Sequence, residues 1–130
     1  TYHGFQPHDK VVEALGKAHI FAFPSIWVET SCIAAIEAMS AKCLTVTNNL
    51  GALPETCANF ASMYQFTEDG QKHVNRFASI LNNTINVMKN NSGWQNQLEV
   101  QKNYFDNFYS WNFRAKEWDL LLKGLADGSQ

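Results

Sequence analysis

Two acidic residues stand in an otherwise apolar stretch of the chain, residues 24–39. Glu29 and Glu37 are eight positions apart among Pro, Ser, Trp, Thr, Cys, Met, Ile, Val and Ala. Charge beside an apolar core is costly unless a ligand or partner compensates for it. A carboxylate offers two acceptor oxygens, so it can hold a vicinal pair of hydroxyls through charge-assisted hydrogen bonds. The pair therefore predicts recognition of a ligand that carries hydroxyls at two places.

Between the two acids, Thr30, Ser31 and Cys32 open a segment that we expect to be helical over residues 30–42. The segment is rich in Ala and lacks Gly and Pro, and Thr30 or Ser31 would serve as its N-cap. Free N–H groups at a helix start form an anion site, for phosphate above all. A nucleotide-sugar fits this arrangement, because its diphosphate would meet the amides while one carboxylate holds the sugar and the other the ribose.

The elements that must position these residues alternate between strand and helix. We expect a strand remnant over residues 1–5, a helix over 8–18 with Asp9 as candidate N-cap, strands over 19–25, 43–48 and 61–66, and a short helix opening at Pro54 and Glu55. This order predicts an α/β fold, a Rossmann-like parallel sheet of three to four strands with flanking helices. Ligands bind beyond the carboxyl ends of parallel strands. The loops over residues 4–7, 25–29 and 48–53 should therefore meet at one crevice.

The second half of the chain predicts helices only. We expect them over residues 71–90, 94–109 and 111–125, with Ser110 as N-cap of the last. One apolar stripe on the first of them consists of Val74, Phe77, Ile80, Leu81, Thr84, Ile85 and Met88. We therefore read a single partial domain, with an α/β nucleotide-sugar-binding part over residues 1–70 and C-terminal helices over residues 71–130.

Composition excludes several classes of protein. With 130 residues, 45% hydrophobic, the chain can bury a core, so wholesale disorder is not expected. A net charge of −2 gives no basic footprint for nucleic acid or an anionic membrane, and no apolar run approaches the roughly 20 residues of a membrane span. Three cysteines, Cys32, Cys43 and Cys57, favour a reduced, cytoplasmic setting over a disulfide framework, and the four histidines, His3, His8, His19 and His73, have no metal-ligand spacing.

Together these motifs resemble those of retaining GT-B glycosyltransferases (glycosyltransferase family 4, group 1). The resemblance rests on Pro24-Ser25 after a strand, on the EX7E motif from Glu29 to Glu37, on Ala38-Met39, and on the loop over residues 51–55 ending in Pro-Glu. It covers roughly residues 1–57, and residues 109–118 are similar to the family's closing helices.

The resemblance implies a role for each motif. The family has two Rossmann-like domains and transfers a sugar, here expected to be a hexose, from a nucleotide-sugar with retention and without a metal. Glu29 would be the catalytic-site acid that holds the donor sugar's hydroxyls, and Glu37 would hold the ribose hydroxyls. The backbone of Thr30, Ser31 and Cys32 would meet the diphosphate. Three further residues complete the expected donor contacts: Ser25, Gly4 near the nucleotide base, and Gly51 at a turn that needs positive φ.

The chain also departs from the family pattern. Cys32 and Ala52 stand where the family often has Gly, and the Arg and Lys that neutralise the leaving diphosphate are not found. We therefore expect the back half of a donor-binding domain, inactive by itself. The acceptor, a glycan, lipid or protein in polysaccharide biosynthesis, would bind a missing N-terminal domain. We expect a cytoplasmic location, with peripheral membrane association open for the full-length protein. Two alternatives stay open: a GT-B-like nucleotide-sugar epimerase and a non-catalytic Rossmann-like interaction module.

Overall fold

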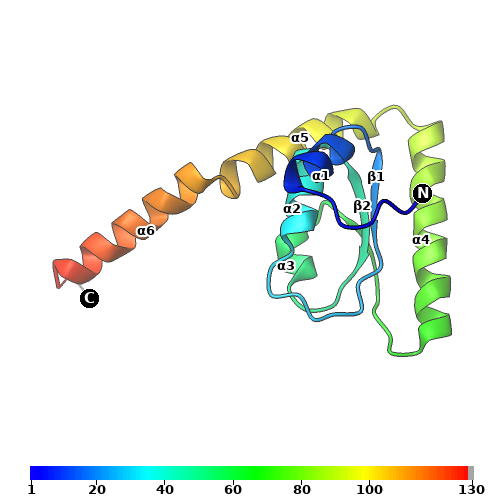
Figure 1. Cartoon of the computed structure of the whole chain (residues 1–130), viewed down its shortest axis with the longest axis horizontal. Coiled ribbons are helices and arrows are strands. Elements are labelled where there is room, and N and C mark those ends of the chain that lie inside the picture. The colour runs from blue at the N-terminus through cyan, green and yellow to red at the C-terminus, as the bar shows by residue number, and fades with distance from the viewer. Residues whose placement is uncertain (129–130) are drawn as a thin grey trace.

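The computed structural model describes residues 1–128. Nine elements lie in this part of the chain (Figure 1): α1 (His8–Leu15), β1 (Ile20–Phe23), α2 (Ile33–Ser40), β2 (Leu44–Asn48), α3 (Leu53–Cys57), β3 (Ser62–Tyr64), α4 (Gly70–Asn90), α5 (Trp94–Phe108) and α6 (Trp111–Ala126). The expected α/β fold with a three-stranded parallel sheet and C-terminal helices is confirmed.

The sheet has the order β1-β2-β3, and all strands run parallel. Ile20 pairs with Leu44, and Val46 pairs with Ser62. The last four residues of β2 are buried because this strand is central and covered on both faces. The apolar run of β1 predicts a fully buried strand, but β1 lies at an edge of the sheet and is only half-buried, with Ala22 exposed.

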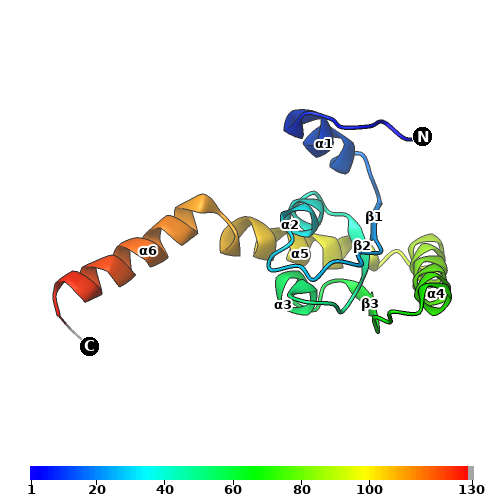
Figure 2. The ribbon, with the colours of Figure 1, turned by 60° about the horizontal axis from the view of Figure 1, so that its bottom comes forward.

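Helices cover both faces of the sheet. The crossovers through α2 and α3 advance in the same direction along the sheet, so their common handedness places both helices on one face. Figure 2 shows α2, α3 and α5 on that face and α4 on the opposite one. On the α4 face, the hydroxyl of Tyr64 lies 3.1 Å from Nε2 of His73, and both residues are buried.

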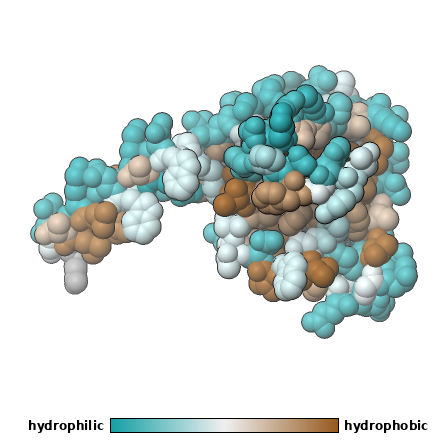
Figure 3. Space-filling view, in the orientation of Figure 1, coloured by the Kyte–Doolittle hydropathy of each residue, from teal (hydrophilic) through white to brown (hydrophobic). Residues whose placement is uncertain are grey.

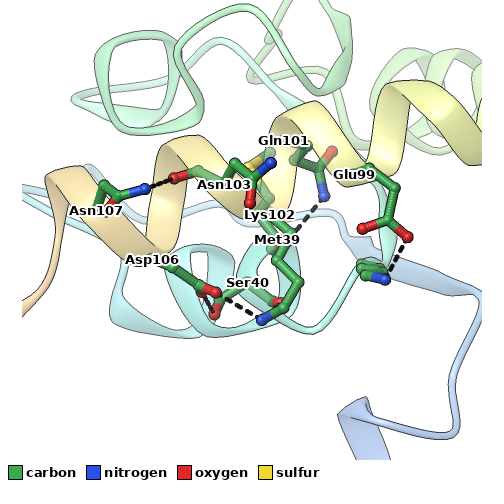
Figure 4. Close-up of polar contacts among 9 residues, drawn as sticks. Met39, Ser40, Glu99, Gln101, Lys102, Asn103, Asp106 and Asn107 are labelled. Carbon is green, nitrogen blue, oxygen red and sulfur yellow. Dashed lines mark hydrogen bonds and ion pairs between the residues drawn. The ribbon is translucent and has the colours of Figure 1, made fainter.

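A buried apolar cluster joins α2, α3 and α5; it consists of Cys32, Ala35, Met39, Leu53, Cys57 and Phe105. One buried side chain also binds the end of α2 through polar contacts. Nε2 of Gln101 donates to the carbonyls of Met39 and Cys43 at 3.0 and 3.1 Å. Beside it, Lys102 donates to the Ser40 carbonyl of α2 at 3.1 Å and to the Asp106 carboxylate at 2.7 Å (Figure 4). These contacts fix α2, the helix that carries Glu37.

The last helix, α6, projects away from the body of the molecule (Figure 1) and buries none of its residues. Ser110 is its N-cap, as predicted, because its Oγ accepts from the amide of Phe113 at 3.2 Å. Apolar side chains are exposed on α6 and on the body, where Figure 3 shows them in brown. No helix in the described residues combines the length and apolar character needed to cross a membrane.

Several details of the sequence-based expectations are wrong. Residues 1–5 form no strand, since they are exposed and pair with no neighbouring strand. Asp9 lies in the first turn of α1 and is not its N-cap, which is Pro7. The second helix begins at Ile33, so neither Thr30 nor Ser31 caps it.

The stripe expected on α4 is also shifted at its start. Val74 is 57% exposed, whereas His73, which is not part of the expected stripe, is 7% exposed and packs against the sheet. The rings of Tyr64 and Phe66 meet the His73 ring edge-on, with centroids 5.4 and 5.6 Å away. A histidine with an aromatic surrounding and a hydroxyl partner can take a core position that an apolar pattern assigns to its neighbour.

Candidate functional site

Two loops meet at the carboxyl ends of β1 and β2. The first runs over residues 24–32 and the second over residues 49–52. The amide of Ala52 donates to the carbonyl of Glu29 at 2.8 Å. Deeper in the structure, the buried Asn48 donates from Nδ2 to the Ser25 carbonyl at 2.5 Å, and its Oδ1 accepts from the Leu50 amide at 2.9 Å. The two loops therefore form one surface, as expected for strand-end loops.

Gly51 makes the close approach of these loops possible. Its φ is +59°, in the region that favours glycine. A Cβ at this position would lie 2.6 Å from the carbonyl oxygen and 2.8 Å from the amide nitrogen of Glu29. Gly51 thus holds the backbone beside Glu29, and the expected turn with positive φ is confirmed.

The buried Ser25 uses its hydroxyl inside the first loop. Its Oγ accepts from the amide of Trp27 at 3.2 Å and lies 3.3 Å from the carbonyl of the same residue. The side chains of Ile26, Trp27 and Val28 are 66–76% exposed. This turn fixes the backbone that leads to Glu29, so the role of Ser25 seen here is local and structural.

The backbone N–H groups just before α2 have no acceptor within the described residues. No hydrogen bond joins the N–H groups of Thr30, Ser31 or Cys32 to another residue of the described part of the chain. The Cys32 side chain is buried, which raises the pKa of its thiol; the Ala35 amide opposes this, and the nearby Glu29 carboxylate raises the pKa further. The thiol is therefore neutral and adds no negative charge beside these amides, whose N–H groups can attract an anion.

Glu37 occupies the outer side of α2. Its Oε1 accepts a hydrogen bond from Nε2 of His8, the first residue of α1, over 2.6 Å. The carboxylate lines an open cavity of about 500 Å³ between α1, α2 and α5, which also includes Leu15, Lys102 and Phe105. Of Glu29 and Glu37, only Glu37 is among the described residues that line this cavity.

The structure thus brings together Ser25, Glu29, Cys32 and Gly51, and it places Glu37 on the adjoining helix. The sequence predicts that the loop over residues 4–7 meets the other two loops, but the structure does not bring it to them. That segment runs beside α1 (Figure 2), and Gly4, with φ +67°, has open space around it.

Two residues at this site, Asn48 and His8, are not predicted from the sequence pattern. Asn48 joins the strand-end loops; its position, a polar residue that closes a β-branched run, could have indicated it. His8 contacts Glu37 across 29 positions, and nothing in the local pattern indicates such a partner. Its contact depends on how α1 lies on α2.

Metal-binding residues and disulfides are not part of this arrangement. Among residues 1–128, no group of three or more His, Cys, Asp or Glu side chains is placed to hold a metal ion. Cys32, Cys43 and Cys57 are all buried and free. Burial raises the pKa of the Cys57 thiol to about 12, so at neutral pH it is a protonated core residue.

Comparison with known proteins gives one result for the matched part of the chain. A family model described as "Glycosyl transferases group 1" matches residues 1–96. The matched segment includes the whole sheet, both strand-end loops and α2 with Glu37. The chain has no significant match among curated proteins or solved structures.

Proposed function

The chain belongs to the group 1 glycosyl transferases, and we propose that its residues 1–70 bind the nucleoside-diphosphate-hexose donor while α4 and α5 pack against this part of the chain. The reaction would transfer the hexose with retention and without a metal ion. One observation carries the proposal: a strand-end surface combines three free amides with Glu29, and Glu37 follows on the helix that starts there.

The diphosphate is the first part of the ligand that this surface suits. The amides of Thr30, Ser31 and Cys32 precede the start of α2 and have no partner among the described residues. N–H groups at a helix start attract phosphate through hydrogen bonds and the helix dipole. Because α2 begins at Ile33, the anion would lie slightly before the helix, against the extended backbone that leads into it.

The two acids would hold the hydroxyls on either side of the diphosphate. Glu29 has its backbone fixed by Ala52 and by the close approach of Gly51, which suits a residue that positions the donor sugar at the reacting carbon. Glu37 would hold the ribose. Ser25 would act indirectly through the loop backbone, and Gly4 would approach the base only if α1 and its preceding segment move closer.

Positive charge for the leaving group is not supplied by these loops. Residues 24–41 and 43–71 contain neither Lys nor Arg. Stabilisation of the charge that develops in the transition state is usually a large part of catalysis. We therefore propose that this chain binds the donor but does not turn it over without further residues. The acceptor, glycan, lipid or protein, would be bound by those residues, in a full-length enzyme located in the cytoplasm or at its membrane.

The proposal is tested by NMR titration of the chain with UDP and GDP, since the base is not specified. We expect at least one of them to shift the amide resonances of residues 29–34. Glu37→Gln should weaken the affinity, because a neutral amide loses the charge-assisted bonds to the ribose. Glu68→Gln, which changes an exposed acid on another loop, is the matched control and should bind as the wild type does.

Two results would overturn the proposal. One is the absence of any shift with both nucleotides at millimolar concentration. The other is binding that Glu37→Gln and Glu29→Gln leave unchanged with the corresponding nucleotide-sugars, because the carboxylates would then have no part in recognition. Release of nucleotide from UDP-glucose or GDP-mannose by this chain alone would refute the expected inactivity.

A further inference from the structure

A histidine outside the strand-end loops contacts one of the two acids. Nε2 of His8 and Oε1 of Glu37 are 2.6 Å apart. A carboxylate can only accept, so Nε2 of His8 carries the proton in this hydrogen bond. The contact joins the first residue of α1 to the middle of α2.

Stability of the fold does not account for this pair. The His8 side chain is 73% exposed, and α1 has no buried residue. Ion pairs at exposed positions contribute little to stability. Glu37 differs from the other ion-paired carboxylates of the described residues, because 27% of its side chain is exposed, whereas the others are 40–60% exposed. The hydrogen bond from His8 therefore holds the least exposed of these ion-paired carboxylates.

The charged residues next to Glu37 bind one another, so His8 is the residue that orients its carboxylate. Lys102 and Asp106 line the same cavity, but Lys102 binds the Asp106 carboxylate at 2.7 Å and the Ser40 carbonyl at 3.1 Å. Asp106 also accepts from the hydroxyl of Ser40. These groups satisfy one another. The described residues offer Oε2 of Glu37 no hydrogen bond, so this oxygen is free to accept from a ligand.

We propose that His8 is a positioning residue for the donor: by holding one oxygen of Glu37, its imidazole directs the other oxygen to the ribose hydroxyls. This inference rests on the proposed function. A glutamate has three side-chain torsions, and holding one oxygen before the ligand arrives reduces the ordering that binding must impose. His8 contacts no part of the donor and acts only through Glu37.

The test separates the ribose from the diphosphate. Affinities of UDP, GDP and inorganic pyrophosphate are measured by NMR titration for wild type, His8→Ala and His8→Gln. We expect His8→Ala to weaken nucleotide binding by about 2- to 10-fold, the equivalent of one hydrogen bond. Pyrophosphate binding should be unchanged, because it has no ribose. His8→Gln should restore nucleotide binding, since its amide donates from a similar distance.

Two controls show that the effect passes through Glu37. In a Glu37→Gln background, His8→Ala should have no further effect on nucleotide affinity. His3→Ala changes another exposed histidine of the same segment and should bind as the wild type does. Because His8 is exposed, its variants should keep the wild-type melting temperature.

The outcomes distinguish the two proposals. If the wild type binds a nucleotide but His8→Ala leaves its affinity unchanged, or weakens nucleotide and pyrophosphate equally, the positioning role of His8 is wrong and the proposed function stands. If the wild type binds neither nucleotide, the proposed function fails, and the role of His8 fails with it.

Discussion

Replacing Gly51 with alanine should destabilise the chain at the point where its two strand-end loops meet. The new Cβ would lie 2.6 Å from the carbonyl oxygen of Glu29, whereas even close C–H···O contacts need about 3.3 Å. The loops must separate by roughly 0.7 Å to relieve this contact. The hydrogen bond from Ala52 to Glu29, now 2.8 Å, would then exceed the range of a normal N–H···O bond.

The expected cost follows from two contributions. Alanine at φ +59° costs about 1–2 kcal/mol relative to an ordinary backbone conformation, and the loss of the hydrogen bond costs about 1 kcal/mol. We therefore expect Gly51→Ala to lower the free energy of unfolding by about 2–3 kcal/mol. Urea unfolding followed by far-UV circular dichroism measures this difference, and the midpoint should fall without a change in slope.

The matched control is Gly4→Ala. Gly4 also has positive φ, +67°, but nothing lies within 4 Å of an added Cβ. Its exposed segment can change conformation, so we expect an effect within about 0.5 kcal/mol, as at other unconstrained surface positions. If Gly51→Ala were equally neutral, the close contact with Glu29 would not exist in solution, and the view that Gly51 fixes this loop would be refuted.

Three further predictions concern the core, the termini of helices and the thiols. Gln101→Leu should destabilise the fold by about 1–3 kcal/mol in urea unfolding, because the carbonyls of the buried residues Met39 and Cys43 both lose the Gln101 amide as a donor; an unchanged midpoint would contradict this. Asp69 caps α4 by accepting from the Lys72 amide, which lowers the carboxyl pKa. The ionised Asp69 carboxylate therefore stabilises the folded state above the unfolded-state pKa, and this stabilisation is lost as pH falls through the lower folded-state pKa. The melting temperature of the wild type should accordingly fall more steeply below about pH 4 than that of Asp69→Asn. Burial raises the pKa of Cys57 to about 12 and also raises that of Cys32, so native protein should react slowly with a thiol reagent and all cysteines should react in urea; rapid native labelling would show that the core opens.

Much of this fold can be predicted from the sequence, because its elements have strong local patterns. The apolar runs of β1 and β2 and the short β3 candidate predicted the three strands within a few residues. The rule that ligand loops follow parallel strands also predicted that the loops after β1 and β2 meet. Ser110 was identified as an N-cap because the preference of such positions for a hydroxyl residue is local.

The positions that could not be predicted depend on contacts between distant residues. Thr30 and Ser31 have the right side chains for capping, so the sequence predicts too early a start for α2; in the structure the helix begins only after Cys32, whose backbone is extended. Similarly, His73 is buried because Tyr64 offers a partner, and His8 meets Glu37 only once α1 lies against α2. Periodicity within a helix carries no information about such partners.

Glu29 and Glu37 are held by different kinds of contact, and this difference has a consequence for recognition. Glu29 is fixed through its backbone, by Gly51 and Ala52, whereas Glu37 is held through its side chain, by His8. A backbone contact cannot be adjusted without moving both loops, while the side-chain contact leaves the second carboxylate oxygen of Glu37 to accept from a ligand. Under the proposed function, the sugar end of the site is therefore held by loop backbone, and the ribose end is held by one hydrogen bond between side chains. Substitutions at Gly51 should then affect nucleotide-sugars more than nucleotides, and substitutions at His8 should affect both equally.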